Sequence, residues 1–317
     1  MWVPYLALGP LKAESAEETT AAAENDERPR PFLVAFFLES PARREIESDF
    51  ALAEERVLDL VDLDGRIVRA RLCPGRNGRL SEIVFSIEAR GAEEALALGW
   101  RAVAGSCARW TVASGRGLAL SGARIADLEH GARWRILPFQ PSTVALPELA
   151  PAALRPEHAF VLRAYEEARR GRSVVLRLLA AHRILAAFAS SAEPFAGTDR
   201  CAAAFGLARA PVAIGRLDLV LADCRALLPE PVPIPLPRVL DWLAPRVERA
   251  RALLDPRAPI GDGKAWYAFE AERELTGAAN LADLLAHRIL AEELRLCAEL
   301  ARIGAGRAAE PGHAATS

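Results

Sequence analysis

The sequence predicts an α+β protein, with a mixed α/β N-terminal domain followed by an all-α helical bundle domain. Before residue 140, short β-branched and aromatic runs mix with helical patterns without regular alternation. From Pro156 onward the periodicity is almost wholly helical, and 317 residues that are 51% hydrophobic suffice for two cores. We expect a flexible leader (1–31), an α+β domain (32–140), a proline-rich linker (141–155), a helical bundle domain (156–303) and a flexible tail (304–317).

The N-terminal elements follow from local patterns. Residues 13–31 are rich in Glu, Ala and Thr, a composition that favours disorder, and Phe32–Leu38 is an apolar run typical of a buried strand. Asp64-Gly65 predicts a hairpin turn between two strands. Trp100 and Trp110 are expected as core anchors of a helix. The expected strands cover 57–61, 66–72, 81–89, 117–121 and 133–139, and the expected helices cover 42–55 and 92–113.

The C-terminal half begins after a linker punctuated by Pro141, Pro147 and Pro151. Five prolines between 229 and 237 predict an extended connector, because proline does not fit consecutive helical turns. The expected helices cover 156–170, 173–189, 199–207, 214–228, 237–254, 264–275 and 280–303.

The block Ala-His-Arg-Ile-Leu-Ala occurs twice, at 181–186 and 286–291. A helix over 174–189 would be apolar on nearly every side, which is typical of a central bundle helix. Both histidines lie among leucines at helical spacing, so we interpret His182 and His287 as structural polar residues of the core. Buried polar groups are normally paired, and we therefore expect at least one imidazole to be buried and bonded to a carboxylate or a backbone carbonyl.

An alternative interpretation makes the chain a helical-domain ribonuclease or RNA-binding protein that uses Arg177 and His182, as catalytic residues in the first case. Their spacing matches the R-x4-6-H signature of helical nucleases of the HEPN type, in which Arg and His act on an RNA phosphodiester. Five positions along an unbroken helix correspond to about 500°, which leaves the two side chains roughly 140° apart. They would meet at one phosphate only if the helix bends between them.

Composition argues against several other classes of protein. The 40 basic and 42 acidic residues give a net charge of -2, with no global attraction to nucleic acid or to an anionic membrane. Five scattered cysteines without a C-x-x-C pair predict neither a disulfide framework nor a zinc site. The first ten residues lack the basic start of a secretory signal, and the longest apolar run is too short for a membrane span. We expect a cytoplasmic protein that does not bind membranes, and any binding to nucleic acid would have to be local.

Motifs for catalysis and cofactor binding are absent from the sequence. It contains no G-x-S-x-G elbow, and Gly261-Asp262-Gly263-Lys264 lacks the remaining residues of a phosphate-binding loop. No pair of histidines has the spacing of metal ligands. We therefore predict no catalytic residue, no cofactor and no metal.

The order of these pieces resembles the methylamine utilisation protein MauJ family. The residues that carry the resemblance are Ala164–Ala168, with Tyr165, followed by the leucine-rich Val174–Leu185, in which Arg183 precedes Ile184-Leu185. Related helical domains often carry a later Arg-to-His motif, but no histidine follows Arg257 within 258–264, which argues against nuclease activity. The resemblance implies a cytoplasmic protein encoded with methylamine dehydrogenase genes, without catalytic residues to carry over. We expect a non-enzymatic accessory protein that supports expression or biogenesis of that enzyme, with a protein partner of unknown identity.

Overall fold

The computed structural model describes residues 11–39, 48, 50–61, 66–116, 118–136, 156–170, 173–192, 195–214, 234–255 and 269–309. The chain forms two compact units. One, here called the sheet unit, comprises Tyr5–Gln140 and Arg257–Thr276. The other, the helical unit, comprises Met1–Pro4, Pro141–Pro256 and Gly277–Ser317. This architecture confirms the predicted α+β class, while the predicted domain limits remain predictions.

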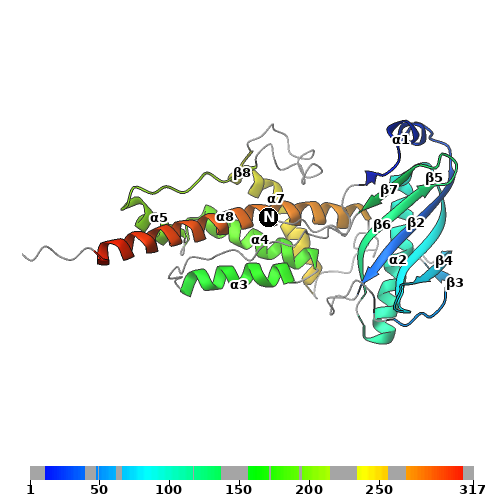
Figure 1. Cartoon of the computed structure of the whole chain (residues 1–317), viewed down its shortest axis with the longest axis horizontal. Coiled ribbons are helices and arrows are strands. Elements are labelled where there is room, and N and C mark those ends of the chain that lie inside the picture. Colours follow the sequence, from blue (N-terminus) through cyan, green and yellow to red (C-terminus); the bar gives the residue numbers. More distant parts are fainter. Residues whose placement is uncertain are drawn as a thin grey trace, which may run out of the picture. The chain divides into compact units, whose positions relative to one another are not determined.

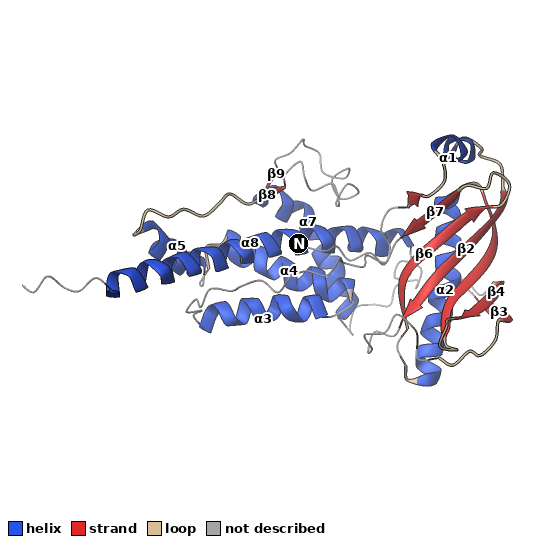
Figure 2. Ribbon diagram, viewed as in Figure 1, coloured by secondary structure: helices blue, strands red, loops and turns tan. Residues whose placement is uncertain are grey.

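The sheet unit is built on a seven-stranded antiparallel sheet with strand order β1-β7-β6-β2-β5-β4-β3 (Figures 1 and 2). The expected hairpin is confirmed, since Val61 on one strand pairs with Ile67 on the next. Helix α2, Ala92–Ser114, confirms the helix expected over 92–113. The strands are β1 Lys12–Ala13, β2 Arg30–Glu39, β3 Arg56–Val61, β4 Ile67–Pro74, β5 Leu80–Ala89, β6 Ala119–Asp127 and β7 Arg133–Ile136.

The core of the sheet unit lies between α2 and one face of the sheet. Phe32, Val34 and Phe36 alternate along β2 and are buried, as the period of two in a strand requires. Gly99 lets α2 approach this face, because a Cβ atom there would lie 3.0 Å from side-chain atoms of both Val34 and Phe36. Trp100 is buried as expected.

The leader expected to be flexible contains regular structure instead. Helix α1, Glu17–Glu24, and strand β1 lie within it. Arg30 is buried, and its Nη2 donates a hydrogen bond of 2.6 Å to the carbonyl of Ala23, near the end of α1. Its Nε donates a bond of 2.7 Å to Oδ2 of Asp127, at the end of β6. The composition of residues 13–31 predicted disorder because the segment offers few apolar side chains for a core. The structure holds the segment through the buried ion pair between Arg30 and Asp127 instead.

The helical unit contains α3 Pro156–Arg170, α4 Val174–Ala189, α5 Phe195–Ala203, α7 Leu236–Leu254 and most of α8 Phe269–Ala309. Helix α4 contacts α3 and α7, and its Leu178 and Leu185 are fully buried, whereas Leu176 is 52% exposed. Ser173 caps α4 by accepting a hydrogen bond of 3.3 Å from the amide of Leu176. The short strands β8 Ala213–Ile214 and β9 Ile234–Pro235 pair with each other.

Several expected elements have different limits. The two helices expected over 264–275 and 280–303 are one helix, α8, which also continues into the expected tail as far as Ala309. Buried Ala278, Ala279 and Leu281 pack across the expected break, so tertiary contacts support helix where a gap was expected. Helix α5 begins at Phe195 rather than Asp199. The helix expected over 42–55 is wrong where the structure describes it, since residues 48 and 50–55 are not helical and Ala51 forms an isolated bridge with Arg79. The helix expected over 214–228 lies outside the described residues, except for Ile214, which belongs to β8.

We predict that Arg30→Met lowers the free energy of unfolding by about 3–5 kcal/mol, because it leaves the Asp127 carboxylate buried without its cation. Urea unfolding followed by circular dichroism measures this change. Arg28→Met is the matched control, since the Arg28 side chain is 76% exposed and forms a surface ion pair with Asp26. Equal losses in the two variants would show that Arg30 does not anchor the segment.

Candidate functional site

A cluster of buried polar side chains lies inside the helical unit. His158 comes from the first turn of α3, and Thr198 comes from α5. Glu293 and Cys297 stand four residues apart on α8, so they share one face of that helix. We call His158, Thr198, Arg209, Glu293 and Cys297 the Glu293 cluster.

The Glu293 carboxylate is the centre of this cluster, and partners on both sides engage it. Its Oε1 lies 2.7 Å from Nε2 of His158 and also accepts a hydrogen bond from the hydroxyl of Thr198. Its Oε2 accepts a hydrogen bond from Nη2 of Arg209. Buried charges need such pairing, because an uncompensated carboxylate away from water is costly. The negative charge of Glu293 is therefore balanced inside the protein.

Arg209 is itself fixed from several directions. Its Nε donates a hydrogen bond of 2.8 Å to Oδ1 of Asp199. Its guanidinium carbon lies 5.4 Å from the ring centroid of Phe188 and 5.9 Å from that of Phe195, within the range of a cation–π contact. The cation thus reaches Glu293 in a defined position.

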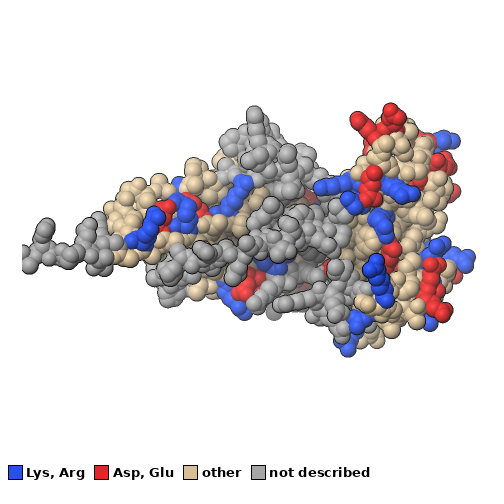
Figure 3. Space-filling model, in the orientation of Figure 1, with Lys and Arg blue, Asp and Glu red and all other residues tan. Residues whose placement is uncertain are grey.

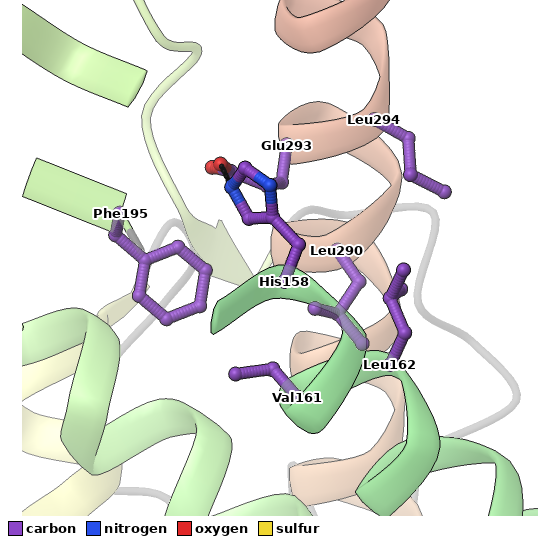
Figure 4. Close-up of a pocket in the computed structure, with 7 residues that line it drawn as sticks. All are labelled: His158, Val161, Leu162, Phe195, Leu290, Glu293 and Leu294. Carbon is purple, nitrogen blue, oxygen red and sulfur yellow. Dashed lines mark hydrogen bonds and ion pairs between the residues drawn. The ribbon is translucent and has the colours of Figure 1, made fainter. Parts of the chain in front are cut away.

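A small pocket opens beside His158 and Glu293 (Figure 4). Its cavity volume is about 10 Å³, which is room for roughly one water molecule. Apart from His158 and Glu293, the lining is apolar and comprises Val161, Leu162, Phe195, Leu290 and Leu294. An organic substrate of several atoms does not fit this volume.

A second polar group joins α3 to α8. Nη1 of Arg169 donates a hydrogen bond of 2.7 Å to Oδ2 of Asp283, which is fully buried. The ring of Tyr165 stacks on His287, with 6.3 Å between centroids and 26° between planes. Burial, followed by the charge of Asp283, raises the pKa of Tyr165 above its ordinary value, against the positive charges of Arg169 and Arg177. Tyr165 is therefore a neutral packing residue at physiological pH.

The histidines singled out from the sequence do not form the expected hydrogen bond. His182 and His287 are half-buried, and among the described residues neither imidazole bonds to a carboxylate or a backbone carbonyl. Burial is the main cause that lowers the pKa of each. His158, which the sequence did not single out, is the buried histidine paired with a carboxylate. Its partner is 135 positions away, so no local pattern reveals the pair.

Arg177 and His182 both lie on α4, where Arg177 is buried and His182 is half-buried. Arg177 is buried, and its charge acts on Tyr165 of α3. The charges that act on His182 belong to Arg251 and Glu248 of α7. Helix α4 runs from Val174 to Ala189 through both residues, so the angular separation expected for an unbroken helix stands. Joint action of the two residues on RNA therefore stays a prediction.

Basic side chains on the described surface of the helical unit lie among acidic ones (Figure 3). Arg295 pairs with Glu292 and Glu299, at 2.7 and 2.8 Å. Its hydrogen bonds lower the pKa of Glu292 to about 2, so this carboxylate stays charged. Arg163 pairs in the same way with Glu166 and Glu167. These two arginines are therefore paired with carboxylates on their own helices.

We predict that Glu293→Gln lowers the free energy of unfolding by about 1–3 kcal/mol, because Arg209, whose side chain is only 9% exposed, then has no opposite charge on this side. Thermal and urea unfolding measure the loss. Glu299→Gln is the matched control on the same helix, since its partner Arg295 is half exposed. A loss no greater than that of the control would mean that the Glu293 cluster does not hold the helices together.

The two half-buried histidines give a pH dependence of defined sign. Their folded-state pKa values lie below the ordinary value of about 6.5, so the unfolded chain binds more protons between the two values. Stability is therefore retained above about pH 6.5 and falls as the pH drops through the folded-state pKa values.

We predict that a His182→Gln, His287→Gln variant loses less stability than the parent chain between about pH 7.5 and 5.5. Urea unfolding across this range measures the difference. Arg183→Gln is the control, because it changes a residue next to His182 without removing an imidazole. Parallel pH profiles for the parent and the double variant would contradict the burial of these two histidines.

Comparison with known proteins places the chain in a family. Residues 5–136 match the family model described as methylamine utilization protein MauJ, N-terminal domain.

The methylamine utilization protein MauJ of Paracoccus versutus is 33% identical over 93% of this chain and 94% of its own length. The protein of the same name from Paracoccus denitrificans is 32% identical over 93% of this chain and 96% of its own length. The protein of that name from Methylorubrum extorquens is 31% identical over 95% of this chain and 99% of its own length. No solved structure matches the chain. The chain therefore belongs to the methylamine utilization protein MauJ family.

Proposed function

We propose that this protein is a non-enzymatic, cytoplasmic accessory protein of methylamine utilisation, which supports the expression or biogenesis of methylamine dehydrogenase. The observation that carries the proposal is similarity to three MauJ proteins across nearly the whole chain. Because the match includes both units, the role of those proteins in methylamine utilisation extends to this chain as a whole.

The chemistry of the Glu293 cluster supports a structural role over turnover of a substrate. His158, Thr198 and Arg209 all direct polar atoms at one carboxylate. A general base must reach a proton of its substrate, and the pocket beside His158 has space for about one water molecule. These groups join α3, α5 and α8 to one another, which suits a protein that presents a fixed surface to a partner.

The state of the cysteines supports a cytoplasmic location. Cys73, Cys107, Cys201 and Cys297 are present as thiols. Burial raises the pKa of the Cys107 thiol to about 12, which keeps it protonated and unreactive. Thiols of this kind are typical of a reducing compartment. In the part of the chain that the structure describes, each helix is too short or too polar to span a bilayer.

Deletion of the gene in its own bacterium tests the proposal. After a shift from ammonium to methylamine as nitrogen source, we expect slower accumulation of assembled methylamine dehydrogenase, measured as activity and as subunit protein per cell. The gene supplied in trans should restore the rate, and growth on ammonium should be unchanged. Unaltered accumulation of the enzyme, or turnover of methylamine by the purified protein, would overturn the proposal.

A further inference from the structure

Three side chains of the Glu293 cluster carry the donor atoms of a transition-metal site. His158, Glu293 and Cys297 are all buried, and one ligand atom from each lies within 4.8 Å of the others. Imidazole nitrogen, carboxylate oxygen and thiolate sulfur are the ligands that zinc takes in proteins. The thiolate and the imidazole disfavour magnesium and calcium, which prefer oxygen ligands.

The spacing of these atoms suits a tetrahedral ion. Metal–ligand bonds of about 2.0–2.3 Å give ligand–ligand separations of roughly 3.3–3.8 Å in a tetrahedron. Nε2 of His158 lies 2.7 Å from Oε1 of Glu293, and Sγ of Cys297 lies 3.9 Å from the same oxygen. The observed distances bracket the tetrahedral value, so small side-chain movements would place three ligands around one centre.

We propose that His158, Glu293 and Cys297 bind one zinc-class divalent ion inside the helical unit. The ion displaces the thiol proton of Cys297, which leaves to solvent, and it binds Nε2 of His158 as a neutral imidazole that carries its single proton on Nδ1. Glu293 offers Oε1, while Arg209 continues to hold Oε2. This inference does not depend on the proposed accessory role.

The surroundings supply the rest of such a site. Arg209 orients the carboxylate from outside the ligand set, as partners of metal ligands commonly do. The pocket beside His158 and Glu293 is lined otherwise by apolar side chains, which would limit the access of bulk water to the ion. The ligands come from α3 and α8, so an ion would link the two helices and stabilise the folded chain.

The test uses the full chain, purified without a histidine tag and stripped with a chelator. Zn²⁺ is added, excess ion is removed by gel filtration, and bound zinc is measured by elemental mass spectrometry. Co²⁺ serves as a spectroscopic probe, because four-coordinate cobalt bound to thiolate gives strong visible bands and a thiolate-to-metal charge-transfer band. We expect about one ion per chain, a cobalt spectrum with the charge-transfer band, and a zinc-dependent rise in melting temperature.

Matched variants locate the ion. We expect Cys297→Ser to abolish the charge-transfer band and His158→Gln to weaken zinc binding by more than roughly tenfold. The controls are Cys201→Ser, which removes an exposed thiol, and His182→Gln, which removes a histidine outside the cluster, and both should bind zinc as the parent does. Circular dichroism checks that each variant folds.

Two results would overturn the proposal. One is a parent chain that takes up no zinc at micromolar concentration, or that binds cobalt without the charge-transfer band. The other is zinc binding that His158→Gln and Cys297→Ser leave unchanged, since the ion would then lie elsewhere. If either variant fails to fold, the stoichiometry and cobalt spectrum of Cys201→Ser decide the question, because this chain keeps all three proposed ligands.

Discussion

The charge of Glu293 is the constraint on which the helical unit depends. A carboxylate buried on α8 is stable only where cations and hydrogen-bond donors surround it. Here the donors come from α3, α5 and the segment after α5, through His158, Thr198 and Arg209. Apolar packing between α3, α4 and α7 tolerates some sliding of helices, whereas a carboxylate with three directed partners fixes one arrangement. The position of α8 against α3 is therefore set by polar contacts.

The sheet unit uses the same principle at a different place. Arg30 reaches the carbonyl of Ala23 near the end of α1 and the carboxylate of Asp127 at the end of β6. Asp127 also accepts hydrogen bonds from the amides of Glu129 and His130, at 2.9 and 3.2 Å, which fix the turn before β7. In both units a buried ion pair joins segments that are distant in the sequence.

The sequence predicted the elements whose signals are local. The apolar pattern of α4, the hairpin from β3 to β4 and the helix around Trp100 depend on spacing within a few residues. The candidate site could not be found in this way. His158 and Glu293 are 135 positions apart, and only the packing of α3 on α8 brings them together. The repeated histidine block drew attention to His182 and His287 because repetition is visible in a sequence, while tertiary pairing is not.

A double-mutant cycle between Arg209 and Glu293 tests the central claim most directly. Arg209→Met, Glu293→Leu and the double variant are compared with the parent chain by urea unfolding. We predict that the two changes are coupled by about 0.5–3 kcal/mol, with the double variant more stable than the sum of the single losses implies. Additive losses would contradict the account, because they would mean that this buried pair does not act as a unit.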